Sequence, residues 1–141
     1  MFDKYSKVLA NKPRLLNLLL SFCFLLLALA SKSFTGSFHQ FANHYLGDLF
    51  IVGWLYFLLL LVFPKLRPSL TAAVVFTMSV LVEIAQAHLV SILPGVPSWI
   101  LFWTGTTFDP LDIFVYFAGV ALAVITGLFL MKGEERQVPA A

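Results

Sequence analysis

Four apolar stretches, each close to the length of a bilayer crossing, constrain the fold of this chain most strongly. A hydrocarbon core is crossed by about 20 helical residues, and its interior offers no water to backbone N–H and C=O groups. The alternating pattern of a membrane β-barrel is not visible in the sequence. We therefore predict an all-α integral membrane bundle of about four transmembrane helices, at about Leu15–Ala30, Leu46–Phe63, Leu70–Leu93 and Leu111–Met131.

The composition of the chain excludes the soluble classes of protein. Of its 141 residues, 60% are hydrophobic and 11% are charged, whereas a soluble domain carries roughly 25% charged residues. Soluble, disordered and coiled-coil proteins all need more polar surface than this. Residues 1–131 are therefore predicted to form one transmembrane domain, followed by a short polar tail at residues 132–141. The net charge of +2 is too small and too dispersed for nucleic-acid binding.

The basic residues predict the orientation of the helices. Eight of the nine Lys and Arg residues lie in the N-terminal segment, in the connection between the second and third helices, or in the C-terminal tail. Lys32 alone lies on the other side of the predicted membrane. Because cytoplasmic segments are enriched in Lys and Arg, both termini are predicted to be cytoplasmic.

A second interpretation of the first apolar stretch stays open. Its basic leader, its short apolar core and the Ala28-Leu29-Ala30 sequence before Ser31 also resemble a cleaved secretory signal. The other three helices keep the same orientation in either case.

Glu83 is the most informative polar residue, because it lies about thirteen positions into the third predicted helix. An ionised acid inside a membrane helix costs roughly 2.5 to 3.5 kcal/mol, so it must face the bundle, be protonated or have a partner. Gln86 lies three residues after Glu83 and Ser79 four residues before it, so all three share one stripe of the helix. This polar seam either joins helices by hydrogen bonds or lines a site for a proton, an ion or a headgroup.

Three more acids lie at predicted helix starts. Asp109 and Asp112 flank Pro110 at the start of the fourth helix, where helix capping and the helix dipole are one explanation for both acids and a functional site is the alternative. Tyr116 lies four residues after Asp112 and shares its face. Asp48 lies in the first turn of the second helix, where the dipole explanation also applies.

The sequence indicates no metal site and no cofactor. His39, His44 and His88 lie in or near the same outer layer as the acids, but no pair of them has a helical metal-ligand spacing. Sequences typical of a serine nucleophile, a phosphate-binding loop or a dinucleotide site are also missing. We leave enzymatic activity uncertain and favour a protein without it.

Three segments together resemble a known family. They are Gly47-Asp48, Glu83-Ile84-Ala85-Gln86, and Gly105-Thr106-Thr107-Phe108-Asp109-Pro110-Leu111-Asp112 followed by Tyr116 and Gly119. The pattern resembles the bacterial membrane proteins of domain-of-unknown-function family 2809, and it is similar to the wider VanZ-like group.

The resemblance implies a small multi-pass protein of the bacterial inner membrane, in which Asp48, Glu83, Gln86 and Asp112 match the polar motif positions of the family. VanZ-like proteins are associated with resistance to a lipoglycopeptide antibiotic. This chain lacks the Arg and Asn that VanZ-like proteins have before the fourth helix.

We derive one leading hypothesis and two alternatives. The leading hypothesis is a polar site that faces the outer leaflet and binds a cation, a proton or the headgroup of a lipid-linked molecule. Its candidate residues are Asp48, Glu83, Gln86, Asp112 and Tyr116, with Ser79, His88 and Asp109 as secondary candidates.

The alternatives are a small proton-coupled transporter or channel subunit, and an enzyme that acts on a lipid-linked substrate with a carboxylate base and His88 or His44. The expected partners are the lipid bilayer, a lipid-linked envelope precursor and a second copy of the chain. Clustering of the polar positions in the folded protein is the observation that favours a site.

Overall fold

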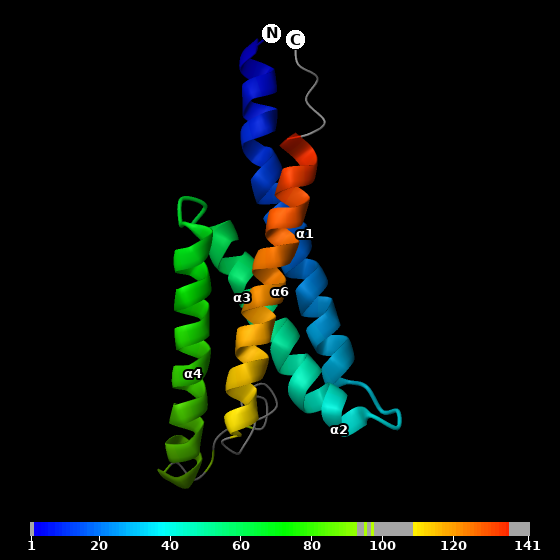
Figure 1. Ribbon diagram of the computed structural model, residues 1–141, viewed down its shortest axis with the longest axis vertical. Helices are drawn as coiled ribbons and strands as arrows, with labels where there is room; N and C mark the ends of the chain where they lie inside the picture. The colour runs from blue at the N-terminus through cyan, green and yellow to red at the C-terminus, as the bar shows by residue number, and fades with distance from the viewer. Residues whose placement is uncertain (1, 93–94, 96, 98–108, 136–141) are drawn as a thin grey trace.

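The protein is a bundle of helices in the part of the chain that the structure describes (Figure 1). The computed structural model describes residues 2–92, 95, 97 and 109–135, and the side chains of residues 13–85, 95, 97 and 109–130. Its elements are α1 (Phe2–Lys32), α2 (His39–Phe41), a π-helix η1 (Ala42–Leu46), α3 (Gly47–Val62), α4 (Pro68–Ile92) and α6 (Pro110–Glu135).

Four helical segments are long and apolar enough to cross a membrane, as the sequence predicts. They are Pro13–Lys32, His39–Val62, Pro68–Ala85 and Pro110–Leu130. The N-terminal end of α1 and the C-terminal end of α6 lie at the same end of the bundle (Figure 1), as an even number of crossings requires. The cytoplasmic location of that end remains a prediction.

Three helix boundaries differ from those expected. The first helix begins at Phe2 rather than near Leu15. The second crossing begins at His39 rather than near Leu46, because α2, η1 and α3 follow one another without a break. The last helix continues to Glu135, so the first four residues of the predicted tail are helical. Half of the segment from Gly105 to Asp112 that carries the family resemblance, residues 105–108, lies outside the described residues.

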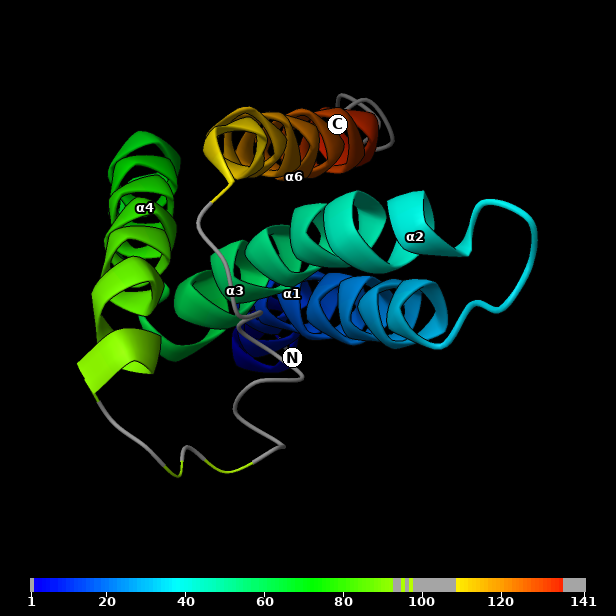
Figure 2. The same ribbon diagram turned by 90° about the horizontal axis from the view of Figure 1, so that it is seen from below.

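Helix α3 is the central element of the bundle. It packs most extensively against α1 and also contacts α6 and α4, and it lies between α1 and α6 in the view from below (Figure 2). Two glycines permit these close contacts. The Phe24 ring of α1 lies against Gly53, and the backbone of α6 at Gly119 approaches the carbonyl oxygen of Leu49.

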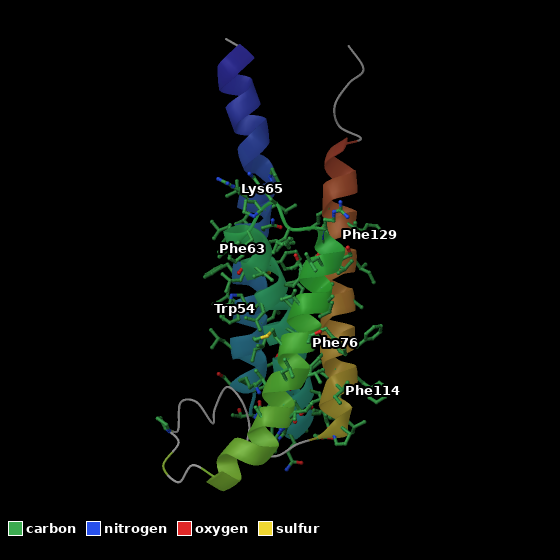
Figure 3. All side chains as sticks on the ribbon, turned by 90° about the vertical axis from the view of Figure 1, so that its left-hand side faces the viewer. Trp54, Phe63, Lys65, Phe76, Phe114 and Phe129 are labelled. Carbon is green, nitrogen blue, oxygen red and sulfur yellow. The ribbon has the colours of Figure 1, made fainter. Side chains whose placement is uncertain are left out.

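Aromatic and aliphatic side chains fill the space between the four long helices. The buried hydrophobic cluster consists of Phe24, Val52, Tyr56, Phe57, Leu60, Val75, Tyr116, Val120 and Ala123. Large apolar side chains also point outward, and Phe114 and Phe129 are 72% and 76% exposed (Figure 3). An outward apolar surface of this kind is unfavourable in water and suits contact with lipid.

Candidate functional site

Glu83 is almost completely buried, with 1% of its surface exposed. Its carboxylate accepts two hydrogen bonds from the start of α6. The backbone N–H of Asp109 donates to Oε1 over 3.0 Å, and the Tyr116 hydroxyl donates to Oε2 over 2.8 Å. Helix α4 continues for nine residues beyond Glu83 to Ile92, so Glu83 lies inside its own helix and yet level with the first turn of α6.

Asp109 joins this contact to the π-helix. Its Oδ1 accepts the backbone N–H of Leu111 over 2.9 Å, and its Oδ2 accepts the Tyr45 hydroxyl over 3.1 Å. The first bond is the N-cap of α6, because it satisfies an N–H that has no partner within the helix. Asp109 therefore caps α6 and also holds η1 against it.

Lys32 and Asp48 form an ion pair between α1 and α3. The Nζ of Lys32 donates to Oδ1 of Asp48 over 2.7 Å, and the two side chains are 11% and 19% exposed. Gly47 makes room for this contact, because a Cβ at that position would lie 2.7 Å from Cε of Lys32 and 2.9 Å from Cδ. The methylene groups of Lys32 thus lie across the glycine.

The π-helix η1 holds the end of α1 by a second contact. With its amide oriented to donate, Asn43 reaches the carbonyl oxygens of Ser31 at 2.5 Å and Lys32 at 3.2 Å. These carbonyls belong to the last turn of α1, which has no partners for them within the helix. Short π-helical segments occur frequently at functional sites, and this one supplies both Asn43 and Tyr45.

Asp112 differs from the other acids because one of its oxygens has no partner. Its Oδ1 is buried and makes no hydrogen bond with the part of the chain that the structure describes. Asp112 occupies the third position of α6, where an acid often closes a capping box by accepting the N–H of the N-cap residue. Here Glu83 of α4 accepts that N–H of Asp109 instead, so capping does not account for Asp112.

These residues form one acidic cluster, which we define as Asp48, Glu83, Asp109 and Asp112 together with Lys32. Asp112 lies within electrostatic range of the other four members, and His44 lies within range of Asp48. Four carboxylates and one ammonium give the cluster a formal charge of −3. It lies where α1 ends and α6 begins, at the end of the bundle opposite the termini (Figure 1).

The structure brings together five of the residues singled out in the sequence, namely Asp48, Glu83, Asp109, Asp112 and Tyr116. Ser79 is half-buried and makes no side-chain hydrogen bond within the described ranges. Gln86 and His88 belong to α4, but their side chains lie outside the described residues. The structure adds Lys32, Tyr45 and Asn43, which the sequence analysis did not include among the site residues.

Among the described residues, no three His, Cys, Asp or Glu side chains are close enough together to hold a metal ion. Donors of the protein itself already occupy two of the carboxylates, because the Tyr116 hydroxyl and the Asp109 N–H bind Glu83 and the Lys32 ammonium binds Asp48. The cluster is therefore a hydrogen-bonded network with excess negative charge, rather than a convergent set of ligands.

Comparison with known proteins places the chain in a family. No curated protein and no solved structure shows significant similarity to it. The family described as "Protein of unknown function (DUF2809)" matches residues 37–120. The matched segment contains every carboxylate of the acidic cluster and excludes Lys32. Since the match covers more than half of the sequence, the chain belongs to the DUF2809 family.

Proposed function

We propose that this small membrane protein binds one positively charged group, an organic ammonium or a proton, in the acidic cluster. The group enters from the end of the bundle opposite the termini, which the distribution of basic residues predicts to be the outer side. We take the organic ammonium to be the headgroup of a membrane amphiphile, because the cluster includes the last residue of α1 and the first turn of α6, where two candidate membrane spans end and begin.

The buried Oδ1 of Asp112 is the single observation that carries this proposal. A buried carboxylate oxygen without a donor is unfavourable, and neighbouring carboxylates make it more so. A proton or an ammonium N–H removes both penalties at once. Lys32 cannot remove them alone, because its ammonium donates to Asp48 and leaves three other acids in the cluster.

An organic ammonium suits this geometry better than a metal ion. A metal ion needs several oxygen or nitrogen ligands at short, fixed distances, and the described residues provide no such set. An ammonium group needs one well-placed carboxylate and a negative surrounding. Exposed aromatic rings at Phe38 and Phe41 flank this end of the bundle, as is typical of a membrane interface.

Native mass spectrometry tests the ammonium form of the proposal. The purified full chain is offered phosphatidylethanolamine, which carries an ammonium, and phosphatidylglycerol, which does not. Wild type is expected to retain phosphatidylethanolamine by about tenfold over phosphatidylglycerol, the factor for one hydrogen bond to a charged group. Asp112→Asn is expected to lose this preference. Asp3→Asn makes the same chemical change near the N-terminal end of α1, at the opposite end of the bundle from the cluster, and is expected to keep the lipid preference.

A second measurement tests the proton form. Dicyclohexylcarbodiimide modifies carboxyl groups that are protonated in an apolar environment, and peptide mass spectrometry locates the product. Modification of Asp112 near pH 7, without any lipid preference, would assign the site to a proton. If the protein shows no lipid selectivity and Asp112 is also not modified, the proposed function is overturned.

A further inference from the structure

The Lys32–Asp48 pair places a positive charge of the protein itself in the acidic cluster. The two side chains are mostly buried but both retain contact with solvent, at 11% and 19% exposure. Lys32 is the last residue of α1, so its side chain leaves from a helix end. We propose that Lys32 is a built-in cation of the cluster, and that it leaves Asp48 when an external positive charge binds there. This inference rests on the proposed function and adds the event that opens the site.

The path of the Lys32 side chain makes such an exchange easy. Its methylene groups lie across Gly47, where a Cβ would meet Cε, Cδ and Cγ at 2.7, 2.9 and 3.1 Å. No side chain at position 47 therefore covers them from that side. A long lysine stem at a membrane interface readily turns its ammonium toward water. Release of Asp48 thus needs only a rotation of the Lys32 side chain.

The backbone at the end of α1 is held independently of the ion pair. Asn43 reaches the carbonyl oxygens of Ser31 and Lys32. Earlier in α1, the Phe24 ring lies against Gly53 of α3. These contacts remain in place when the ammonium of Lys32 moves. The helix is therefore a fixed support, and the lysine side chain is the moving part.

The charges around Asp48 couple the release of Lys32 to the binding of the external cation. The groups that act on Asp48 are Lys32 from α1, His44 from η1, Glu83 from α4 and Asp112 from α6. Lys32 also acts on Asp112, so it shares the negative field in which the external cation would bind. Two positive charges in one site repel each other. Binding of the external cation therefore weakens the Lys32–Asp48 pair, and the closed pair weakens binding of the cation by the same free energy.

Acetylation of lysine side chains tests the exchange. The full chain is placed in phosphatidylglycerol nanodiscs, which leave both membrane faces accessible, and acetylation by an N-hydroxysuccinimide ester is followed by peptide mass spectrometry. Lys65 is exposed in the connection between α3 and α4 and serves as the internal reference. The probe is guanidinium chloride at a non-denaturing concentration, which the reagent does not consume, against equal sodium chloride.

In wild type, Lys32 is expected to react about tenfold more slowly than Lys65, since an ion-paired ammonium is protected for as long as the pair is closed. Asp48→Asn is expected to abolish most of this protection. Gly47→Ala keeps the carboxylate but displaces the lysine stem, and is expected to act in the same direction. Guanidinium is expected to accelerate Lys32 in wild type and to have no effect on its rate in Asp112→Asn.

Equal rates for Lys32 and Lys65 in wild type, or an unchanged Lys32 rate in both Asp48→Asn and Gly47→Ala, would show that the pair does not protect the lysine and would overturn the inference. Guanidinium without effect on Lys32, in a protein that selects phosphatidylethanolamine, would overturn the exchange and leave the proposed function intact. Loss of lipid selectivity and of carbodiimide modification would remove the proposed function itself.

Discussion

Removal of the Glu83 side chain is expected to cost more stability than any other single change in the acidic cluster. The carboxylate is 1% exposed and accepts the Asp109 N–H and the Tyr116 hydroxyl. In Glu83→Ala both donors lose their acceptor in a place that water does not reach. An unsatisfied buried donor costs about 1 to 3 kcal/mol, so the pair costs about 2 to 6 kcal/mol. The empty volume of the side chain adds to this.

Glu83→Gln separates the hydrogen bonds from the charge. The amide oxygen of a glutamine accepts the Asp109 N–H as the carboxylate does. Its NH₂ group donates to the Tyr116 oxygen, because a hydroxyl both donates and accepts. Both contacts survive, so the loss of unfolding free energy is expected to stay below about 1 kcal/mol, the size of one exchanged neutral hydrogen bond. The negative charge is lost completely.

The measurement is unfolding of the purified variants from detergent micelles by sodium dodecyl sulfate, followed by the fluorescence of Trp54 in α3 and of the two other tryptophans. Ser79→Ala, one helical turn from Glu83, is the matched control and is expected to leave the midpoint unchanged. A Glu83→Ala protein within about 1 kcal/mol of wild type would show that the two hydrogen bonds do not form as described. If Glu83→Ala and Glu83→Gln lose the same free energy of unfolding, the conclusion that the hydrogen bonds of Glu83, and not its charge, stabilise the protein is contradicted.

Two further predictions concern α6. Gly119→Ala is expected to destabilise the protein by about 1 to 3 kcal/mol through overpacking, because its Cβ would lie 2.6 Å from the Leu49 carbonyl oxygen. Gly127→Ala, the same change on the same helix with its nearest neighbour at 3.7 Å, is expected to be neutral or stabilising in the same detergent unfolding assay. Tyr116→Phe removes the donor to Glu83 and is expected to cost about 1 to 3 kcal/mol. A variant as stable as wild type would contradict the 2.8 Å contact.

The number and type of the helices follow from the sequence because the bilayer imposes them. An apolar run of membrane length has one stable form in lipid, so hydropathy alone predicts the four crossings. The boundary at His39 does not follow, because the residues from His39 to Tyr45 mix rings with polar groups. Their helical form depends on tertiary contacts, such as the one between Tyr45 and Asp109, which no local pattern encodes.

The sequence analysis singles out the four acids of the cluster, but it does not predict the contacts between the helices that carry them. Helical spacing places Tyr116 on the face of Asp112 and Ser79 one turn from Glu83. It does not reveal that Glu83 pairs with a different helix. Lys32 is not among the predicted site residues, because a lone basic residue near a predicted loop indicates only the orientation of the helices. The available signal is its position in the sequence as the one basic residue on the predicted outer side, in a segment that leads to the Gly47-Asp48 pair.

Capping and function are not competing explanations for the acids at the start of α6. Asp109 serves as an N-cap through its side chain, and its own N–H is satisfied by Glu83 from another helix. Because Glu83 accepts this N–H, Asp112 does not accept it, although the third position of a capping box normally does. The stability of the helix start is therefore secured without Asp112, whose buried Oδ1 has no partner among the described residues. Within the described residues, Asp112 therefore stands in a negative field near Lys32 without a role in capping, and this is the reason that we propose it as the ligand-binding group.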